Sequence, residues 1–420
     1  MRYVIKNATV LTENGFVKTD LHIDNGIVVS IGDCDFSNAE VFDFNNCHIF
    51  PGFADVHVHL REPGFSYKET IASGTRACAR GGYTDVCSMP NLNPVPDNAE
   101  NLQQQLDIIK RDALIGVHPY GALTIGEKGE RLSDIASMAD AAVGFSDDGR
   151  GVQDDNMMEE AMLLVKEMGK IIAAHCEVNE LLFGGYIRDG IYSREHGHRG
   201  IPPESEWKMV ERDLKLAEKT DCKYHICHVS TKESVALIAA AKKRGVDVTA
   251  ETAPHYLILT ENDLQEHGRF KMNPPLGSLE DRQALIDAVL DGTIDMIATD
   301  HAPHSAEEKG KGLEKSMMGV VGIETAFALM YTHFVRNGKM SLRHLVKLLC
   351  DNPRTRFGLG NGVIKVGEKA DFTVFNLEES YHVNPDEFLS MGRSTPFEGE
   401  QVWGRCKLTF ADGNLVWREV

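Results

Sequence analysis

Residues 51–64, PGFADVHVHLREPG, form the stretch from which both the fold and the candidate site are inferred. Phe53 to Leu60 is an apolar run without a helical period, which indicates a buried strand. Side chains alternate along a strand, so His57 and His59 project to the same side, ~7 Å apart. Two imidazoles at that spacing can bind one metal ion, although a His-x-His pair is weak evidence by itself. Pro63 and Gly64 then predict a loop.

Strands and helices alternate downstream of this stretch. The candidate strands are 53–59, 84–88, 115–122, 142–146, 171–175, 223–228, 246–251 and 294–299, and the clearest helical patterns are 98–112, 154–169, 205–219, 231–244 and 280–290. Eight strands that alternate with helices predict an α/β protein with a parallel (β/α)8 TIM-like barrel, which we assign to residues 51–360. No G-x-G-x-x-G follows any strand, which disfavours a dinucleotide-binding fold.

The two ends of the chain resemble each other in pattern. Residues 1–50 are rich in Val and Ile with turn signals near Asn14-Gly15 and Asn25-Gly26, which predicts short antiparallel strands. Residues 361–420 contain further candidate strands and a hairpin turn at Asp412-Gly413. Neither end has enough apolar residues for a core of its own. We therefore expect residues 1–50 and 361–420 to form one composite β-sandwich domain.

Composition limits the classes of partner. The formal net charge is −19 and no basic patch is evident, which argues against nucleic acid. No apolar run approaches the ~20 residues that span a bilayer, and the start lacks the pattern of a secretory signal. The nine cysteines are scattered and never form a C-x-x-C pair. These features predict reduced thiols and a cytoplasmic protein without membrane contact.

Metal-ligand residue types recur where the apolar strands stop. His57 and His59 end the first strand, Asp147 and Asp148 the fourth, His175 the fifth, His228 the sixth and Asp300 the eighth. The carboxyl ends of parallel strands converge on one face of a barrel, so these side chains should meet there. After His228, Ser230 with Glu233 predicts a capping box at a helix start.

These residue types predict a metal centre. A single histidine at a strand end is more often structural than a ligand, but four histidines and two aspartates at five strand ends are hard to explain by packing. Imidazole and carboxylate without thiolate suit Zn²⁺ or a similar divalent ion, and a bridging carboxylate allows one or two ions. Such a centre suits hydrolysis, or its reversal, at an amide-like carbon.

The chain resembles the amidohydrolase superfamily, and within it the longer type of bacterial dihydroorotase. The resemblance is carried by DVHVHLREPG (55–64), MPNLNPV (89–95), GFSDDG (144–149), AHCE (174–177), CHVST (227–231), MNPPL (272–276), ATDHAPH (298–304) and GIET (322–325). It implies a zinc enzyme of pyrimidine synthesis that interconverts N-carbamoyl-L-aspartate and L-dihydroorotate. Its small-molecule substrate would bind at the barrel mouth.

The resemblance also implies roles for individual residues. The metal ligands would be His57, His59 and Asp300 for one ion, His175 and His228 for the second, and Asp148 as the bridge. Asp300 would also transfer the proton in catalysis. Substrate contacts would come from His59, Arg61, Asn91, Asn273, His304 and the backbone at Met318 and Gly319. The chemistry agrees, because a guanidinium matches a carboxylate and an amide can both donate to and accept from a cyclic ureide.

One position separates this chain from many relatives in the superfamily. Hydantoinases and many dihydroorotases bridge their metals with a carboxylated lysine at the end of strand four, where this chain has Ser146 followed by Asp147 and Asp148. Adjacent residues of an extended segment point to opposite sides, so one aspartate is expected to bind metal, and the motif favours Asp148.

Two alternative functions stay open at this point. One is a hydantoinase- or allantoinase-like enzyme. The missing lysine argues against this function, and so does the presence of Arg61 with Asn91. The other is a non-catalytic dihydroorotase-like subunit that supports aspartate transcarbamoylase. The complete set of metal histidines argues against this alternative. The resemblance allows a homodimer and an association with aspartate transcarbamoylase, and the sequence itself shows neither.

Overall fold

The computed structural model describes residues 1–32 and 37–419. Two parallel sheets contain the strands of the central part. One is β6 (Phe53–Val58), β7 (Tyr83–Ser88) and β8 (Gly116–Pro119), and the other is β9 (Gly121–Ala122), β10 (Phe145–Ser146), β11 (Ile171–Ala174), β14 (Lys223–Ile226), β15 (Val248–Thr252) and β16 (Met296–Ile297).

Backbone contacts join these two sheets at both edges. At one edge, the N–H of Val143, just before β10, donates to Pro119 O of β8 at 2.9 Å. At the other edge Val58 forms a parallel bridge with His301, and the His59 N–H donates to His301 O at 2.9 Å. The first strand of the series is therefore bonded to the segment that follows the last strand.

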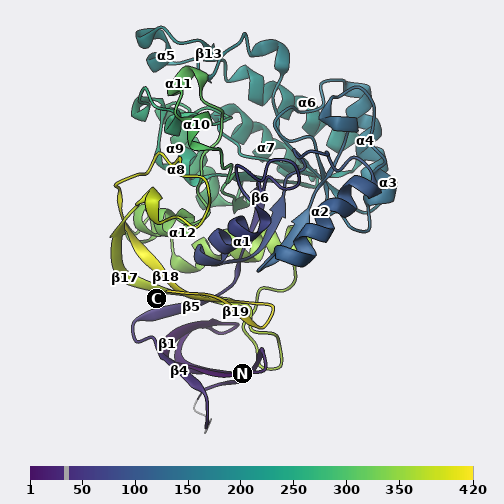
Figure 1. Cartoon of the computed structure of the whole chain (residues 1–420). Helices are drawn as coiled ribbons and strands as arrows, with labels where there is room; N and C mark the ends of the chain where they lie inside the picture. The colour runs from purple at the N-terminus through teal and green to yellow at the C-terminus, as the bar shows by residue number, and fades with distance from the viewer. Residues whose placement is uncertain (33–36, 420) are drawn as a thin grey trace.

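Helices alternate with these strands and cover them (Figure 1). They are α1 (Ile71–Arg80), α2 (Ala99–Asp112), α3 (Ile135–Met138), α4 (Asp155–Glu167), α6 (Glu204–Thr220), α7 (Lys232–Arg244), α8 (Pro254–Ile258), α9 (Leu279–Asp291), α12 (Ala326–Met330), α13 (Leu342–Val346) and α14 (Asn352–Phe357), with the π-helical turns η5 (Tyr331–Val335) and η6 (Lys347–Asp351). The α/β class predicted from the sequence is confirmed. The long loops carry the 3-10 turns η1 (Ile125–Glu127), η2 (Asn179–Leu181), η3 (Glu261–Asp263), η4 (Gly268–Phe270) and η7 (Pro385–Glu387).

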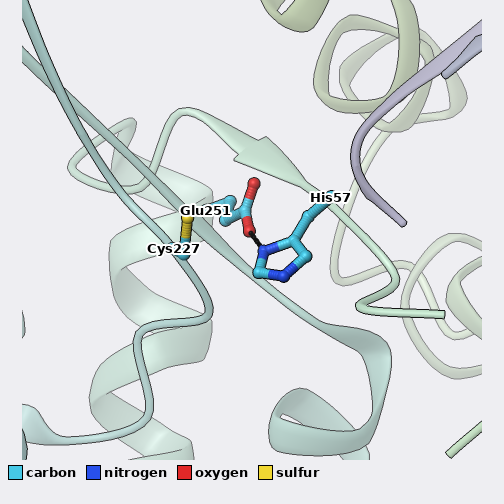
Figure 2. A group of neighbouring side chains, drawn as sticks. All are labelled: His57, Cys227 and Glu251. Carbon is cyan, nitrogen blue, oxygen red and sulfur yellow. Dashed lines mark hydrogen bonds and ion pairs between the residues drawn. The ribbon is translucent and has the colours of Figure 1, made fainter. Parts of the chain in front are cut away.

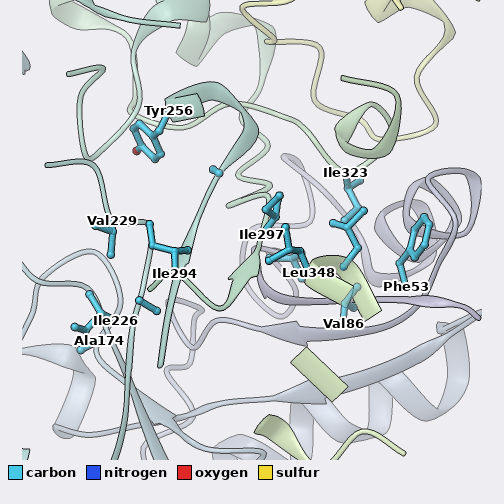
Figure 3. Close-up of a cluster of buried hydrophobic side chains, with 14 of the residues drawn as sticks. Phe53, Val86, Ala174, Ile226, Val229, Tyr256, Ile294, Ile297, Ile323 and Leu348 are labelled. Carbon is cyan, nitrogen blue, oxygen red and sulfur yellow. The ribbon is translucent and has the colours of Figure 1, made fainter. Parts of the chain in front are cut away.

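The core between strands and helices is apolar and closely packed (Figure 3). Phe53 and Val86 come from neighbouring strands, Ala174 and Ile226 from another neighbouring pair, and Leu348 from the helix that packs beneath them. All five side chains are at most 4% exposed. Burial of this kind stabilises the fold by about 1.5–3 kcal/mol for each large side chain, and it makes the strand ends a rigid base for a site.

A separate sheet contains both ends of the chain. Its eight strands are β1 (Arg2–Thr12), β2 (Gly15–Asp24), β3 (Ile27–Ile31), β4 (Glu40–Asp43), β5 (Cys47–Pro51), β17 (Phe372–His382), β18 (Gln401–Ala411) and β19 (Asn414–Arg418). The antiparallel pairing of β5 with β17 joins the two ends, and the sheet has its own apolar cluster. This sheet lies at one end of the molecule, below the α/β part in Figure 1. The domain boundaries at 50/51 and 360/361 stay a prediction.

Two local expectations were wrong. The N-terminal strands are not all antiparallel, because β4 and β5 both pair parallel with β1. Ser230 does not cap helix α7. Thr231 is the N-cap and accepts from Ser234 N at 3.3 Å, while the Ser230 hydroxyl donates to the buried Glu206. The buried carboxylate offers Ser230 a stronger partner than a helix N–H, and only the tertiary fold places it there.

The segments after β11 and β16 contain short helices and strands. The first contains β12 (Ile187–Arg188), α5 (Ile191–His196) and β13 (Gly200–Ile201), and the second contains α10 (Ala306–Lys309) and α11 (Gly312–Lys315). Both lie on the side of the molecule away from the terminal sheet (Figure 1). They therefore surround the carboxyl ends of the parallel strands.

Candidate metal centre and active site

His57 and His59 lie at the end of β6, with ring centroids 5.4 Å apart. Each ring directs Nδ1 at a hydrogen-bond acceptor: Glu251 Oε1 is 2.7 Å from His57, and Asn91 Oδ1 is 2.9 Å from His59. Because Nδ1 donates, the neutral tautomer of each ring has its lone pair on Nε2. Both Nε2 atoms point to the same group of carboxylates.

Those carboxylates are Asp148 and Asp300. His57 Nε2 lies 3.4 Å from Asp148 Oδ1 and 3.5 Å from Asp300 Oδ1. His59 Nε2 lies 3.1 Å from Asp300 Oδ1 and 3.6 Å from Asp148 Oδ2. Ring nitrogens and carboxylate oxygens at this range need positive charge between them, either a proton or a metal cation.

His175 and His228 stand on the other side of Asp148. His175 Nδ1 is 2.9 Å from His228 Nε2, and each of these nitrogens is 3.8 Å from Asp148 Oδ1. The structure therefore places all six predicted ligands in one cluster, although they come from five strands and span residues 57 to 300.

The two adjacent aspartates have different surroundings. Asp147 Oδ1 accepts hydrogen bonds from Leu123 N at 2.8 Å and Thr124 N at 3.0 Å, and its other oxygen accepts from the Thr124 hydroxyl. Asp148 points to the other side, into the histidine cluster. Asp147 therefore stabilises the loop before η1, and Asp148 contacts the imidazoles.

The donor set fits a divalent cation. His57 Nε2 and Asp148 Oδ1 are buried and have no hydrogen-bond partner in the structure. His57, His59 and Asp300 each offer a ligand atom within 4.8 Å of the others, and so do His57, Asp148 and His228. A buried polar atom without a partner is costly, and imidazole with carboxylate oxygen is a usual ligand set for Zn²⁺.

Glu251, next to the last residue of β15, is a site residue that the sequence reasoning missed. Figure 2 shows its carboxylate in contact with the ring of His57, with Cys227 beside them. Its other oxygen accepts from His225 Nε2 at 3.0 Å. Carboxylates in this position orient a metal-binding imidazole and increase its basicity. The available signal was a lone acidic residue inside an otherwise buried strand.

The charges in the cluster favour ionised carboxylates next to positively charged groups. Burial raises the pKa of Asp148, but positive charge on the neighbouring His57 and His59 rings outweighs this effect and holds that pKa well below the usual value. Burial likewise opposes ionisation of Asp300, and His57 with His59 lowers its pKa. Both groups are therefore ionised at neutral pH.

Unusual backbone angles occur at the same place. Arg61, His228 and Asp300 have φ values of 61°, 36° and 47°, a left-handed region that side chains other than glycine rarely adopt. Each conformation costs of order 1–3 kcal/mol and persists only where surrounding contacts impose it. Strain at three site residues indicates that their orientation matters more than local stability.

A cavity of about 260 Å³ opens beside the carboxylates and imidazoles. All the predicted substrate-binding residues line it: His59, Arg61, Asn91, Asn273, His304, Met318 and Gly319. The Arg61 side chain is fixed by a hydrogen bond from Nε to Pro303 O at 3.1 Å. Asn273 Nδ2 donates to Glu177 Oε1 at 3.0 Å, and its Oδ1 has no partner.

His304 lies between the loop backbone and Lys68, with Arg61 beside it. Its Nε2 is 2.8 Å from Met318 O and 3.3 Å from an Arg61 guanidinium nitrogen, and its Nδ1 is 3.2 Å from Lys68 Nζ. Burial, Arg61 and Lys68 lower the pKa of His304 to about 3. The ring is therefore neutral, with Nε2–H donating to Met318 O and Nδ1 accepting from Lys68.

An array of imidazoles and carboxylates that suits a divalent cation, beside an arginine-lined cavity at the ends of parallel strands, defines a metal-dependent amidohydrolase. A family profile described as Dihydro-orotase-like matches residues 47–234. A dihydroorotase of Fusobacterium nucleatum is 48% identical over 99% of this chain and 98% of that protein. A dihydroorotase of Bacillus cytotoxicus is 46% identical over 100% of this chain and 99% of that protein. The chain belongs to the dihydroorotase family.

Solved structures agree with this fold. An L-hydantoinase (dihydropyrimidinase) from Arthrobacter aurescens matches with a TM-score of 0.88 and 26% identity, covering 99% of this chain and 96% of the other. A dihydropyrimidinase from Brevibacillus agri matches with a TM-score of 0.87 and 25% identity, covering 100% and 95%. In the described residues, no helix has the length and apolar character to span a membrane.

Proposed function

We propose that this protein is a zinc-dependent dihydroorotase that interconverts N-carbamoyl-L-aspartate and L-dihydroorotate. The observation that carries the proposal is the position of Arg61: it lines the same cavity as His59, Asp148 and Asp300, and its Nε already has a backbone partner, so the remaining guanidinium face can bind a ring carboxylate. Full-length similarity to dihydroorotases supports the same substrate.

We infer that the two parallel sheets close into one (β/α)8 barrel and that the terminal strands form a sandwich-like β domain beside it. The backbone bonds at both sheet edges support the barrel, and the β5–β17 pairing supports a composite domain of 1–50 and 361–420. The cluster would then lie at the barrel mouth, where such folds have their active sites.

One or two Zn²⁺ ions would be held by His57, His59 and Asp300, by His175 and His228, and by Asp148 between them. When bound, the ions would supply Lewis acidity for the ring carbonyl under attack. The Nε2 atoms of His57 and His59, which face Asp148 and Asp300, and the lack of a hydrogen-bond partner for His57 Nε2 support this assignment.

In the hydrolytic direction Asp300 moves the proton. Its lowered pKa makes it a carboxylate that can accept a proton from the attacking water, and the same oxygen can then protonate the ring nitrogen as the amide C–N bond breaks. Arg61 and His304 would bind the substrate carboxylate, and Asn91 and Asn273 the ring. In the direction of ring closure the same proton returns by the reverse path.

A hydantoinase-like activity is the competing function, because hydantoinases share the fold. Assays of dihydroorotate and hydantoin with the purified protein, before and after chelation and after Zn²⁺ is restored, distinguish them. We expect turnover of dihydroorotate that chelation abolishes and Zn²⁺ restores. Faster turnover of hydantoin, or activity unaffected by complete metal removal, would contradict the proposal. A non-catalytic scaffold would turn over neither compound.

A cytoplasmic location, a homodimer and an association with aspartate transcarbamoylase are further predictions. They rest on composition and family resemblance.

A further inference from the structure

Lys309, the last residue of α10, is a buried lysine whose partners are all backbone carbonyls. Its side chain is 5% exposed. The ammonium donates to Gly319 O at 2.7 Å, Met317 O at 2.8 Å and Lys271 O at 3.0 Å. An ammonium has three donors, so these three bonds use all of them.

The three carbonyls belong to two backbone segments that border the substrate cavity. Met317, Met318 and Gly319 line the cavity. Lys271 lies two residues before Asn273, which also lines it. Lys309 does not line the cavity itself. A single side chain therefore ties together the two backbone segments that carry the proposed ring contacts.

Two further contacts fix the loop backbone at Gly319. Gly319 N–H donates back to Lys271 O at 3.0 Å, so the two segments already share one direct bond. Gly319 has φ +130°, and a Cβ there would come within 2.9 Å of Ala302. The loop backbone therefore packs directly against Ala302, where a side chain at position 319 would not fit.

The charge of Lys309 points to the same role. Burial and the nearby Lys271 lower the pKa of Lys309 to about 7. The three acceptors favour the protonated form, because only the ammonium can donate three hydrogen bonds. A buried cation without a carboxylate partner is costly for folding, so simple packing does not explain this residue.

We propose that Lys309 is a positioning residue for substrate binding, which holds the 317–319 backbone against the 271–273 segment so that both face the substrate ring. The proposal rests on the proposed function of the cavity. Binding sites need their contact groups fixed within a fraction of an ångström by supporting residues that do not touch the ligand. Loss of Lys309 should therefore weaken ground-state binding more than the chemical step.

The test compares K309M and K309Q with the wild type and with K311M. Lys311 is on the same loop but 48% exposed, so its substitution is a matched control. Met removes the donor from all three carbonyls, of which Lys271 O keeps its bond from Gly319 N–H, while the Gln amide can donate to two of them. The readouts are KM and kcat for dihydroorotate, zinc content and thermal unfolding of the full-length holoenzymes.

We expect K309M to raise KM about tenfold with kcat within about twofold of wild type and an unchanged zinc content. K309Q should lie between K309M and wild type, and K311M should match the wild type. If K309M does not fold, K309Q carries the test. A KM for the Lys309 variants within about twofold of wild type, or a loss confined to kcat or zinc content, would overturn the proposal.

Failure of the proposed function would appear differently. In that case the wild type itself would not turn over dihydroorotate. If it turns over hydantoin, the same comparison of KM is made with hydantoin, and Lys309 is judged on that result.

Discussion

His57 Nδ1 lies 2.7 Å from Glu251 Oε1, and both side chains are at most 1% exposed. This buried contact fixes the tautomer that turns His57 Nε2 toward Asp148 and Asp300. Three groups of potential metal ligands in the described residues share His57. The orientation of this one ring therefore affects each of these three groups.

Replacement of Glu251 by Gln should weaken metal binding. The amide keeps the size of the side chain but removes the charge that polarises His57, and loss of such a partner typically costs 10–100-fold in metal affinity. Competition with a zinc chelator of known affinity measures the change. The exposed Glu218, changed to Gln, is the control. Equal zinc affinity of E251Q and wild type would show that His57 does not depend on this contact.

The adjacent aspartates should respond differently to the same substitution. D148N should lose most of its bound zinc, because Asp148 is the carboxylate that meets the histidines. D147N should retain zinc but lose about 1–3 kcal/mol of unfolding free energy, because the Leu123 and Thr124 donors lose a charged acceptor. Metal analysis and denaturant unfolding separate the two effects. Zinc loss in D147N alone would reverse the assignment.

Replacement of Arg61 by Met should raise KM for dihydroorotate much more than it changes metal content. Arg61 lines the cavity, and a charged hydrogen bond to a substrate carboxylate contributes about 1.5–3 kcal/mol, so an increase of roughly 10–100-fold is expected. R61K provides a comparison that keeps the charge but not the planar fork. Unchanged kinetics in R61M would remove Arg61 from the substrate site.

His304 should make folding sensitive to acid. Its pKa is lowered to about 3 in the fold, against ~6.5 in an unfolded chain. The unfolded state therefore binds more protons between these values, and stability falls as pH drops from 6.5 toward 3. At pH 5 the cost is on the order of 2 kcal/mol.

H304N, measured by denaturant unfolding at pH 7 and pH 5, should lose less stability on acidification than the wild type. Equal losses in the two proteins would show that His304 does not titrate as inferred. The substitution should also raise KM, since the ring contacts Arg61 and Met318.

The sequence alone determined the order of elements and which residues end the strands. Apolar runs, turn residues and helical periods are local, so His57, His175 and His228 could be assigned to strand ends without coordinates. The adjacent Asp147 and Asp148 were distinguished only by a family motif, because backbone alternation says that they diverge but not which one faces the histidines.

Tertiary structure alone decided which polar groups support the site. Glu251 is 194 residues from His57, and Lys309 is 38 residues from Lys271. No local sequence pattern predicts such pairs, because the packing of strands and loops determines which groups come within hydrogen-bond distance. The same reason explains Ser230, which local spacing predicts as a helix cap but which the fold brings to the buried Glu206.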